Sequence, residues 1–331
     1  MPNYHIYGVG AALVDTEILV TDEFLEANQI EKGLMTLVDE DRQQSIIQAI
    51  QDANHHVKKA SGGSACNTVV AAAQLGASAF YSAKVAADAD GDFFVNDLKE
   101  AGVGFHDIEA ESGTTGKCLV MITPDAERSM NTYLGASVDY TTRETDFTAL
   151  AQSQWLYLEG YLVTDDSRTA AAGEIMQYAK EHGVKTALSL SDPFVVEVFK
   201  DNLLRVMNGK IDMLFCNAAE AMAFTGMKSV QDAAMSLQHH AKYFAITMGK
   251  QGSVVFDGST LIHAPGNAVD AIDTNGAGDM FAGAFLAGIS LGKNFKDAAT
   301  LANEAASRVV AQFGPRLEPL HFDQLRQEFN L

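Results

Sequence analysis

The stretch Asp273-Thr274-Asn275-Gly276-Ala277-Gly278-Asp279 leads directly into the apolar run MFAGAFLAGI at residues 280–289. Small residues stand where a loop becomes a helix, so the N–H groups of Gly276, Ala277 and Gly278 can converge on an anion without obstruction by side chains. Asp279 falls in the first helical turn, where a carboxylate can accept a proton from a substrate hydroxyl while the helix end stabilises a transferring phosphoryl group. The pattern therefore predicts a phosphate cradle and a catalytic base at one helix end. The alternative is a glycine-rich turn whose acid only complements the helix dipole.

The helix after this cradle is apolar on nearly every face, which predicts that it is buried between other elements. The whole chain has 331 residues, of which 47% are hydrophobic. This is enough to bury a large core, as one α/β domain or one domain with a small appendage.

The net charge of −20 argues against polynucleotides and anionic membranes as partners. The three cysteines are far apart, which fits a reducing compartment better than a disulfide framework or a zinc site. We expect no secretory signal at the start of the chain, and the apolar run 280–291 is too short to span a bilayer. The sequence therefore predicts a cytoplasmic protein with no membrane role.

Buried strands alternate with helices along much of the chain, which predicts a doubly wound α/β fold with a mostly parallel sheet and helices on both faces. Ligands of such sheets bind beyond the carboxyl ends of the strands. The expected strands are 6–10, 79–85, 155–158, 185–190, 211–216 and 243–248, and the expected helices include 39–53, 64–75, 93–101, 167–182 and 295–313. Extended segments at 17–20, 34–38, 117–123 and 127–134 interrupt this rhythm and predict a separate small sheet.

Three further motifs stand at strand ends. Gly62-Gly63 precedes a helix that carries Asn67, and these glycines allow close approach of a ligand or form only a tight turn. Asn217 and Glu220 open another helix, where they form a capping box or help to hold hydrated Mg²⁺. Thr247-x-Gly249-x-x-Gly252 suits a backbone surface against a nucleotide or a hairpin turn.

A competing interpretation is a dinucleotide-dependent oxidoreductase built on Gly8-Val9-Gly10. The third glycine of that motif is missing and Leu13 stands in its place, so this signal is weak.

Taken in order, the four motifs resemble the ribokinase-like (PfkB-type) carbohydrate kinase family over nearly the whole chain. The resemblance implies one ribokinase-like kinase domain over residues 1–331, with a β-sheet lid formed by segments at about 16–38 and 105–135. It also implies ATP-dependent, Mg²⁺-assisted phosphorylation of a sugar or nucleoside hydroxyl.

The resemblance assigns roles by matching positions. Asp279 is the expected catalytic base, with Gly276, Ala277 and Gly278 as the anion hole. The ribose hydroxyls are expected to bind to Asp15, Gly62, Gly63 and Asn67. The carboxylate of Asp15 suits a cis-diol because both of its oxygens accept hydrogen bonds. ATP and Mg²⁺ are assigned to Asn217, Glu220, Thr247, Gly249, Gly252, Asn275 and Asn303. A monovalent cation, K⁺, is assigned to Asp273 with the backbone near Val309, Gln312 and Gly314.

Within the family the chain is most similar to the adenosine kinases, because it has Asn275 and because Arg128 falls where they use a lid arginine. Flat apolar walls for an adenine ring are expected from Leu13, Met35, Tyr133 and Tyr161. Glu159 argues for a different acceptor, because free-sugar kinases bind a sugar hydroxyl near this position.

These features lead us to expect transfer of the γ-phosphoryl group of ATP to the 5′-hydroxyl of a nucleoside, adenosine above others. The alternatives are a ribokinase-type sugar kinase, an inosine or guanosine kinase, and a non-catalytic nucleoside-binding module. We expect a monomer or a homodimer formed through the lid.

Overall fold

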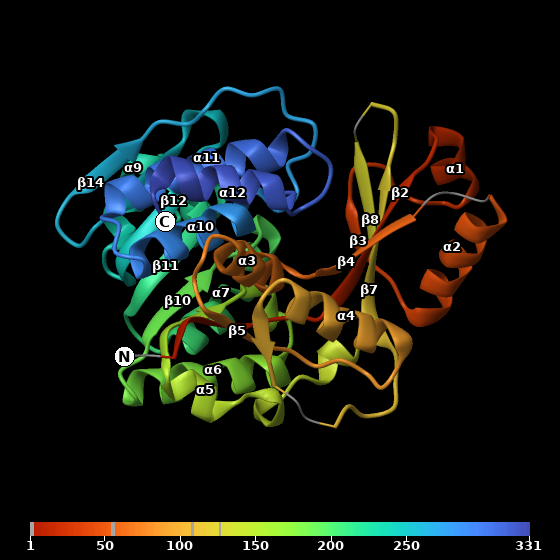
Figure 1. The fold of residues 1–331 in the computed structure, drawn as a ribbon, viewed down its shortest axis with the longest axis horizontal. Helices are drawn as coiled ribbons and strands as arrows, with labels where there is room; N and C mark the ends of the chain where they lie inside the picture. Colours follow the sequence, from red (N-terminus) through yellow and green to blue (C-terminus); the bar gives the residue numbers. More distant parts are fainter. Residues whose placement is uncertain (1–2, 54–56, 107–108, 126) are drawn as a thin grey trace.

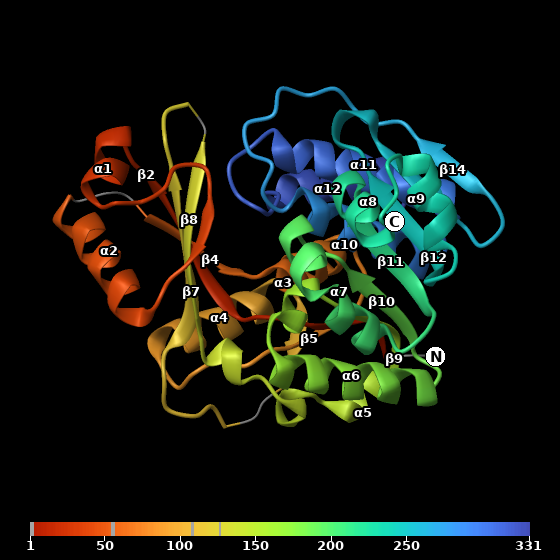
Figure 2. The same cartoon turned by 180° about the vertical axis from the view of Figure 1, so that it is seen from behind.

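The computed structural model describes residues 3–53, 57–106, 109–125 and 127–331. It contains a nine-stranded and a five-stranded sheet, which lie side by side in both views of the ribbon (Figures 1 and 2). The fold is the predicted doubly wound α/β architecture with a second, small sheet. No helix among the described residues is long and apolar enough to cross a membrane.

The large sheet has the order β14-β13-β12-β11-β10-β9-β1-β5-β6. All neighbours from β12 to β6 pair in parallel, and at the other edge β13 pairs antiparallel with both β12 and β14. The strands are β1 (Tyr4–Val9), β5 (Ala79–Ser82), β6 (Val103–Phe105), β9 (Ser153–Leu158), β10 (Lys185–Ser189), β11 (Ile211–Asn217), β12 (Ala241–Thr247), β13 (Ser253–Phe256) and β14 (Leu261–Ala264).

Helices cover both faces of the large sheet because each parallel strand is buried on both sides. Neighbouring residues of one strand therefore belong to different cores: Ile6 packs with α3 and α10, whereas Tyr7 packs with α6. One face carries α3 (Ser64–Gln74), α4 (Ala89–Glu100), α10 (Ala277–Ser290), α11 (Phe295–Val310) and α12 (Pro319–Phe329). The other face carries α5 (Phe147–Ala151), α6 (Asp166–Glu181), α7 (Pro193–Met207), α8 (Ala218–Thr225) and α9 (Val230–Leu237).

The helix that follows the cradle is buried as predicted, since every residue from Met280 to Gly288 is buried. It packs against α3 at very short range, because a Cβ atom on Gly283 would lie 2.3 Å from the carbonyl oxygen of Thr68. A glycine at this position lets the two helix backbones touch. The first turns of α3 and α10 are thereby brought together.

The small sheet has the order β3-β8-β7-β2-β4. Its strands are β2 (Leu13–Leu19), β3 (Met35–Leu37), β4 (Val57–Gly62), β7 (Thr115–Ile122) and β8 (Arg128–Gly135). α1 (Asp22–Ala27) and α2 (Glu40–Asp52) cover one face through an apolar cluster that includes Ile18, Ile46 and Leu119. The other face is turned toward the large sheet, as the lining of the cavity described below shows.

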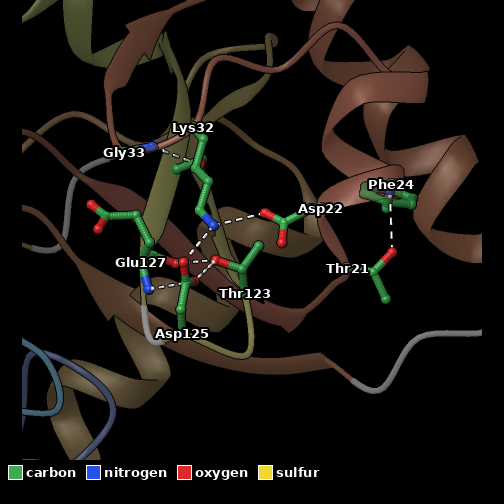
Figure 3. Close-up of polar contacts among 9 residues, drawn as sticks. Thr21, Asp22, Phe24, Lys32, Gly33, Thr123, Asp125 and Glu127 are labelled. Atoms are coloured by element: carbon green, nitrogen blue, oxygen red, sulfur yellow. Dashed lines mark hydrogen bonds and ion pairs between the residues drawn. The ribbon is translucent and has the colours of Figure 1, made fainter.

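Polar contacts fasten the outer end of the small sheet (Figure 3). The ammonium group of Lys32 lies 2.7 Å from a carboxylate oxygen of Asp22 in α1 and 2.6 Å from one of Asp125 in the turn between β7 and β8. The hydroxyl of Thr123 donates to Asp125. These exposed contacts connect the β7–β8 hairpin to α1, although each ion pair at the surface contributes little stability by itself.

Several element boundaries differ from the expectation. Strands β4 and β6 were not predicted, and neither were helices α1, α5, α7, α9 and α12. The helix expected at 93–101 begins four residues earlier, because the side chain of Asp88 caps its first turn. The helix expected to reach residue 313 ends at Val310, where the chain turns toward Gly314.

Candidate active site

A cavity of about 720 Å³ lies between the two sheets, at the carboxyl ends of β1, β9, β10, β11 and β12. It brings together most residues that the sequence singled out. These are Asp15, Met35, Gly63, Asn67, Glu159, Tyr161, Asn217, Glu220, Thr247, Gly249, Gly252, Asn275, Gly276, Ala277, Gly278, Asp279 and Asn303. Gly62, Arg128, Tyr133 and Asp273 are not among the described residues that line it.

The cradle is formed by the start of α10. Gly276 is the N-cap residue with a φ of 73°, in the left-handed region that glycine adopts without strain, and no side chain caps the helix. A Cβ atom on Gly276 would lie 2.7 Å from Pro315, so this loop also packs too closely for a larger residue. The N–H groups of the first turn are thus left for an anion, with the positive end of the helix dipole behind them.

Asp279 projects from this first turn toward α3. Its carboxylate accepts a hydrogen bond of 2.6 Å from the hydroxyl of Ser64 and a longer one of 3.4 Å from the amide nitrogen of Asn67. Burial raises the pKa of Asp279 to about 6, and these hydrogen bonds oppose the shift. At neutral pH the carboxylate is therefore mostly ionised, and its proton affinity is close to what a general base requires.

Asp15 is a second acid in the same cavity. Only 7% of its surface is exposed, and its carboxylate makes no hydrogen bond or ion pair with any residue in the described part of the chain. A Cβ atom on Gly62 would lie 2.2 Å from this carboxylate, so the glycine is what gives Asp15 its room. Burial raises the pKa of Asp15 to about 7. A buried acid without partners is a site where ligand hydroxyls can donate.

Glu159 also lines the cavity, but both of its oxygens are already used. They accept backbone N–H groups, at 2.9 Å from Ala11 and at 2.8 Å from Ala65. The carboxylate therefore connects the end of β9 to the β1–β2 connection and to the first turn of α3. Burial raises the pKa of Glu159 to about 7.

The opposite end of the cavity contains the motifs assigned to ATP. Asn217 and Glu220 form a complete capping box, in which each side chain accepts the backbone N–H of the other residue at 2.9 Å. Burial raises the pKa of Glu220 to about 7. Asn217 is paired in register with Thr247 on the next parallel strand, so these two strand ends are adjacent.

The glycines after Thr247 shape a tight connection between β12 and β13. Gly249 and Gly252 have φ values of 55° and 90°. A Cβ atom on Gly252 would lie 2.1 Å from the carbonyl oxygen of Ala264. The side-chain amide of Asn303 donates to the same carbonyl at 3.0 Å and thereby fixes the floor of this region. The expected hairpin turn is present, and its surface also lines the cavity.

Asp273 and Arg128 form a buried ion pair between the loop before α10 and strand β8 of the small sheet. The Asp273 carboxylate also accepts the N–H groups of Asn275 at 3.0 Å and Gly314 at 2.8 Å. Burial nevertheless raises the pKa of Asp273. The Nε and Nη1 atoms of Arg128 are buried and find no hydrogen-bond acceptor among the residues the structure describes. The carboxylate assigned to K⁺ is therefore already balanced by a cation of the small sheet.

The predicted place of Tyr133 is wrong. In β8, Met130, Thr132 and Leu134 line the cavity. Side chains alternate along a strand, so Tyr133 points to the other face, where its hydroxyl donates to Glu40 of α2. Leu134, one residue further along the strand, lines the cavity instead.

Some residues in or next to the cavity were not identified from the sequence. Ser64 follows Gly63 directly and could have been found from its place in the same first helical turn as Asn67. Phe194 is 62% exposed and lines the cavity after β10, although it carries no motif. Arg316 reaches Asn67 from a loop near the end of the chain, and no local pattern indicated it.

The fold and this arrangement are those of a phosphotransferase with a hydroxyl acceptor, as the known relatives of the chain demonstrate. Residues 34–321 match the family described as pfkB family carbohydrate kinase, and the chain belongs to that family.

Three relatives illustrate its place in the family. The adenosine kinase of Saccharomyces cerevisiae (strain ATCC 204508 / S288c) is 29% identical over 93% of this chain and 95% of its own length. The crystal structure of a probable sugar kinase protein from Rhizobium etli CFN 42 superposes with a TM-score of 0.88 at 32% identity, covering 100% of this chain and 99% of that one. The adenosine kinase from Sinorhizobium meliloti gives a TM-score of 0.87 at 35% identity, covering 98% and 99% of the two chains. The protein is thus a sugar or nucleoside kinase.

Proposed function

We propose that the protein transfers the γ-phosphoryl group of ATP to the 5′-hydroxyl of adenosine and so produces AMP and ADP, a reaction of purine salvage. The observation that carries this proposal is the placement of Asp279 on the first turn of α10, beside the unobstructed N–H groups of Gly276–Gly278, in one cavity with the unpartnered acid Asp15. Relatives named adenosine kinase support the choice of acceptor.

In this mechanism Asp279 accepts the proton of the 5′-hydroxyl as the oxygen attacks phosphorus. Ser64 and Asn67 hold the carboxylate in place by donating to it. The helix N-terminus stabilises the charge that spreads over the transferring phosphoryl group. Because these dipoles are fixed by α10 before the substrate arrives, little reorganisation is needed during the transfer.

The nucleoside end of the cavity suits a ribose with an attached flat base. Asp15 and Asn67 receive the ribose hydroxyls. Leu13, Met35, Tyr161 and Phe194 offer apolar surface to the base. Glu159 contributes both oxygens to backbone N–H groups, which favours a role in fixing the backbone over a role in binding a sugar hydroxyl.

The residues at the other end fit ATP with Mg²⁺. The N–H groups at the start of α10 suit the phosphates, and the carboxylate of Glu220, which lines the same cavity, suits a hydrated Mg²⁺. The cation, when bound, neutralises phosphate charge and orients the phosphoryl group. Thr247, Gly249, Gly252, Asn275 and Asn303 complete the nucleotide surface. K⁺ would bind the Asp273 carboxylate only by sharing it with Arg128 or by displacing Arg128 from it.

We infer that the chain is one kinase domain in which the small sheet acts as a lid. The Arg128–Asp273 ion pair joins this sheet to the loop before α10, as a closed lid requires. Closure would exclude water, so that the hydroxyl of the acceptor is phosphorylated instead of water. We further propose that the protein is cytoplasmic and is either a monomer or a homodimer formed through the lid.

A sugar kinase is the second candidate, supported by the similarity to the probable sugar kinase protein from Rhizobium etli. A preference for inosine or guanosine is a variant of the first candidate. The two classes differ in what they need next to Asp15: a base requires apolar walls, and a free sugar requires additional hydrogen-bonding groups.

The test is release of ADP with adenosine, inosine, guanosine, ribose and fructose supplied separately, together with ATP and Mg²⁺. We expect adenosine to give the highest kcat/KM. Asp279→Asn should abolish turnover while adenosine binding, measured by calorimetry, remains nearly unchanged. Turnover of ribose or fructose alone would replace the nucleoside assignment by the sugar assignment, and an active Asp279→Asn variant would remove this acid as the base.

A further inference from the structure

Arg316 lies in the loop between α11 and α12, next to the residues that pack on the cradle. Its guanidinium donates to the side-chain oxygen of Asn67 at 3.0 Å, to a carboxylate oxygen of Asp97 in α4 at 3.0 Å and to the hydroxyl of Ser61 in β4 at 2.9 Å. Its neighbour Pro315 lies so close to Gly276 that a Cβ atom on this glycine would be 2.7 Å away from it. One side chain therefore connects the C-terminal loop to α3, α4 and the small sheet.

The contact with Asn67 determines which way its amide points. A guanidinium has only N–H donors, so the amide must present its oxygen to Arg316. The amide nitrogen then faces the other way and donates to Asp279, which as a carboxylate can only accept. No other orientation of the amide satisfies both neighbours, because the reverse would set N–H against N–H and oxygen against oxygen.

The charge of Arg316 also acts on the acids of the cavity. Five carboxyl groups of the described residues line the cavity around Asp279: Asp15 from β2, Glu159 after β9, Asp192 before α7, Glu220 from α8 and Asp279 itself. Two cationic side chains, Arg168 and Lys250, line the same cavity. Arg316 lowers the pKa of both Asp15 and Asp279, against the larger effect of burial. It therefore favours the ionised form of the base.

We propose that Arg316 is a positioning residue of the kinase reaction, which holds the Asn67 amide with its NH₂ group toward Asp279 and so keeps the base oriented for the acceptor hydroxyl. The inference rests on the proposed role of Asp279, but not on the identity of the acceptor. Arg316 itself touches no reacting atom. Its effect on the orientation of the base must pass through Asn67, and this separates it from a residue that merely stabilises the fold.

The test compares Arg316→Met, Arg316→Lys, Asn67→Ala and the double variant Arg316→Met/Asn67→Ala. Assays use whichever of adenosine, inosine, guanosine, ribose or fructose the unaltered protein phosphorylates. Arg316→Met is expected to lower kcat by about tenfold to a hundredfold with a smaller change in KM, the loss typical of a misplaced catalytic group. In the Asn67→Ala background the same change should lower kcat less than threefold.

Arg316→Lys separates charge from geometry. An ammonium group retains the positive charge but cannot make the three divergent hydrogen bonds of a guanidinium. The acid limb of the kcat/KM profile should stay where it is in the unaltered protein, whereas kcat should still fall. In Arg316→Met the limb should move to higher pH.

Arg326→Met is the matched control, because Arg326 also anchors a C-terminal element, through Gln74 and Asp323, but lies outside the cavity. It should leave kcat and the pH profile unchanged. The proposal would be overturned if Arg316→Met lowered kcat equally in the unaltered protein and in Asn67→Ala. It would also be overturned if Arg316→Met had a normal kcat.

A crystal structure of Arg316→Met supplies a readout that needs no acceptor, and Arg316→Gln replaces this variant if it does not fold. The nitrogen of Asn67 should no longer lie within about 3.5 Å of the Asp279 carboxylate. An unchanged position of Asn67 would refute the positioning role of Arg316, whether or not the unaltered protein phosphorylates any of the five acceptors. Failure to phosphorylate all five acceptors would by itself refute only the proposed function.

Discussion

The contact between α10 and α3 gives a prediction whose size can be worked out from the structure. In Gly283→Ala the new Cβ atom would lie 2.3 Å from the carbonyl oxygen of Thr68 and 2.9 Å from the Cβ atom of Ala71, whereas ordinary contacts begin at 3.4 Å. Because backbone atoms cannot rotate away, the helices must separate by about 1 Å to relieve the overlap. Gly283 lies one turn below Asp279 on the same side of α10, so the separation is transmitted to the base.

Two consequences are expected. Overpacking destabilises a core by about 1–3 kcal/mol, and the better helix propensity of alanine returns up to about 1 kcal/mol. A net loss of about 1–2 kcal/mol in a chain of 331 residues lowers Tm by about 2 °C. The Ser64–Asp279 hydrogen bond, now 2.6 Å, would lengthen beyond bonding distance, and kcat should fall about tenfold to a hundredfold.

The measurements are thermal unfolding and steady-state kinetics. Gly173→Ala in α6 is the matched control, because nothing lies within 4 Å of its added Cβ atom. It should raise Tm slightly, since alanine is the better helix former, and leave kcat unchanged. If Gly283→Ala were as active and as stable as the unaltered protein, the close approach of α10 and α3 would not be what places Asp279.

Three further outcomes are expected. Since burial raises the pKa of Asp279 to about 6, kcat/KM should fall about tenfold per unit below about pH 6 and level off above it, and a flat profile down to pH 5 would contradict the role of this acid. Burial raises the pKa of Asp15, Glu159 and Glu220 to about 7, whereas the pKa of these acids in an unfolded chain is about 4. Between these pH values the folded state binds more protons than the unfolded state, so the stability of the protein falls as the pH rises. Tm should therefore be higher at pH 6 than at pH 8, and Glu159→Gln should reduce the difference. Glu220→Gln keeps the capping box but removes the negative charge, so Tm should hardly change. The Mg²⁺ concentration for half-maximal activity should rise about tenfold. An unchanged Mg²⁺ requirement would exclude this carboxylate from binding the cation.

Much of the fold could be predicted because its signals are local. The rhythm of buried strands and helices indicated a doubly wound sheet, and the glycines at 276 and 278 indicated the cradle. Strand β4 escaped prediction because it carries no run of alternating apolar residues; it exists because Ser61 and Gly62 pair with β2. The error at Tyr133 has the same origin, since the face of a strand depends on its register with its partners.

In the candidate site, too, local sequence signals identified residues, whereas their contacts depend on the fold. Local motifs identified Asp279 and Asn67 as polar residues in the first turns of helices, and the family resemblance added Asp15. They did not reveal that Glu159 is already bonded to two backbone N–H groups, or that Arg128 pairs with Asp273.

The sequence by itself determined where the backbone must turn tightly, which helix must be buried and which acids stand beside a helix end, because these properties depend on neighbouring residues. Only the tertiary structure decided the partners of Asp279, Glu159 and Asp273, which lie far from these acids in the sequence. Arg316 and Asn67 are 249 residues apart, and their contact exists only when the C-terminal loop lies on the cradle. The orientation of the proposed base therefore depends on the packing of the whole domain, even though its identity is legible in seven consecutive residues.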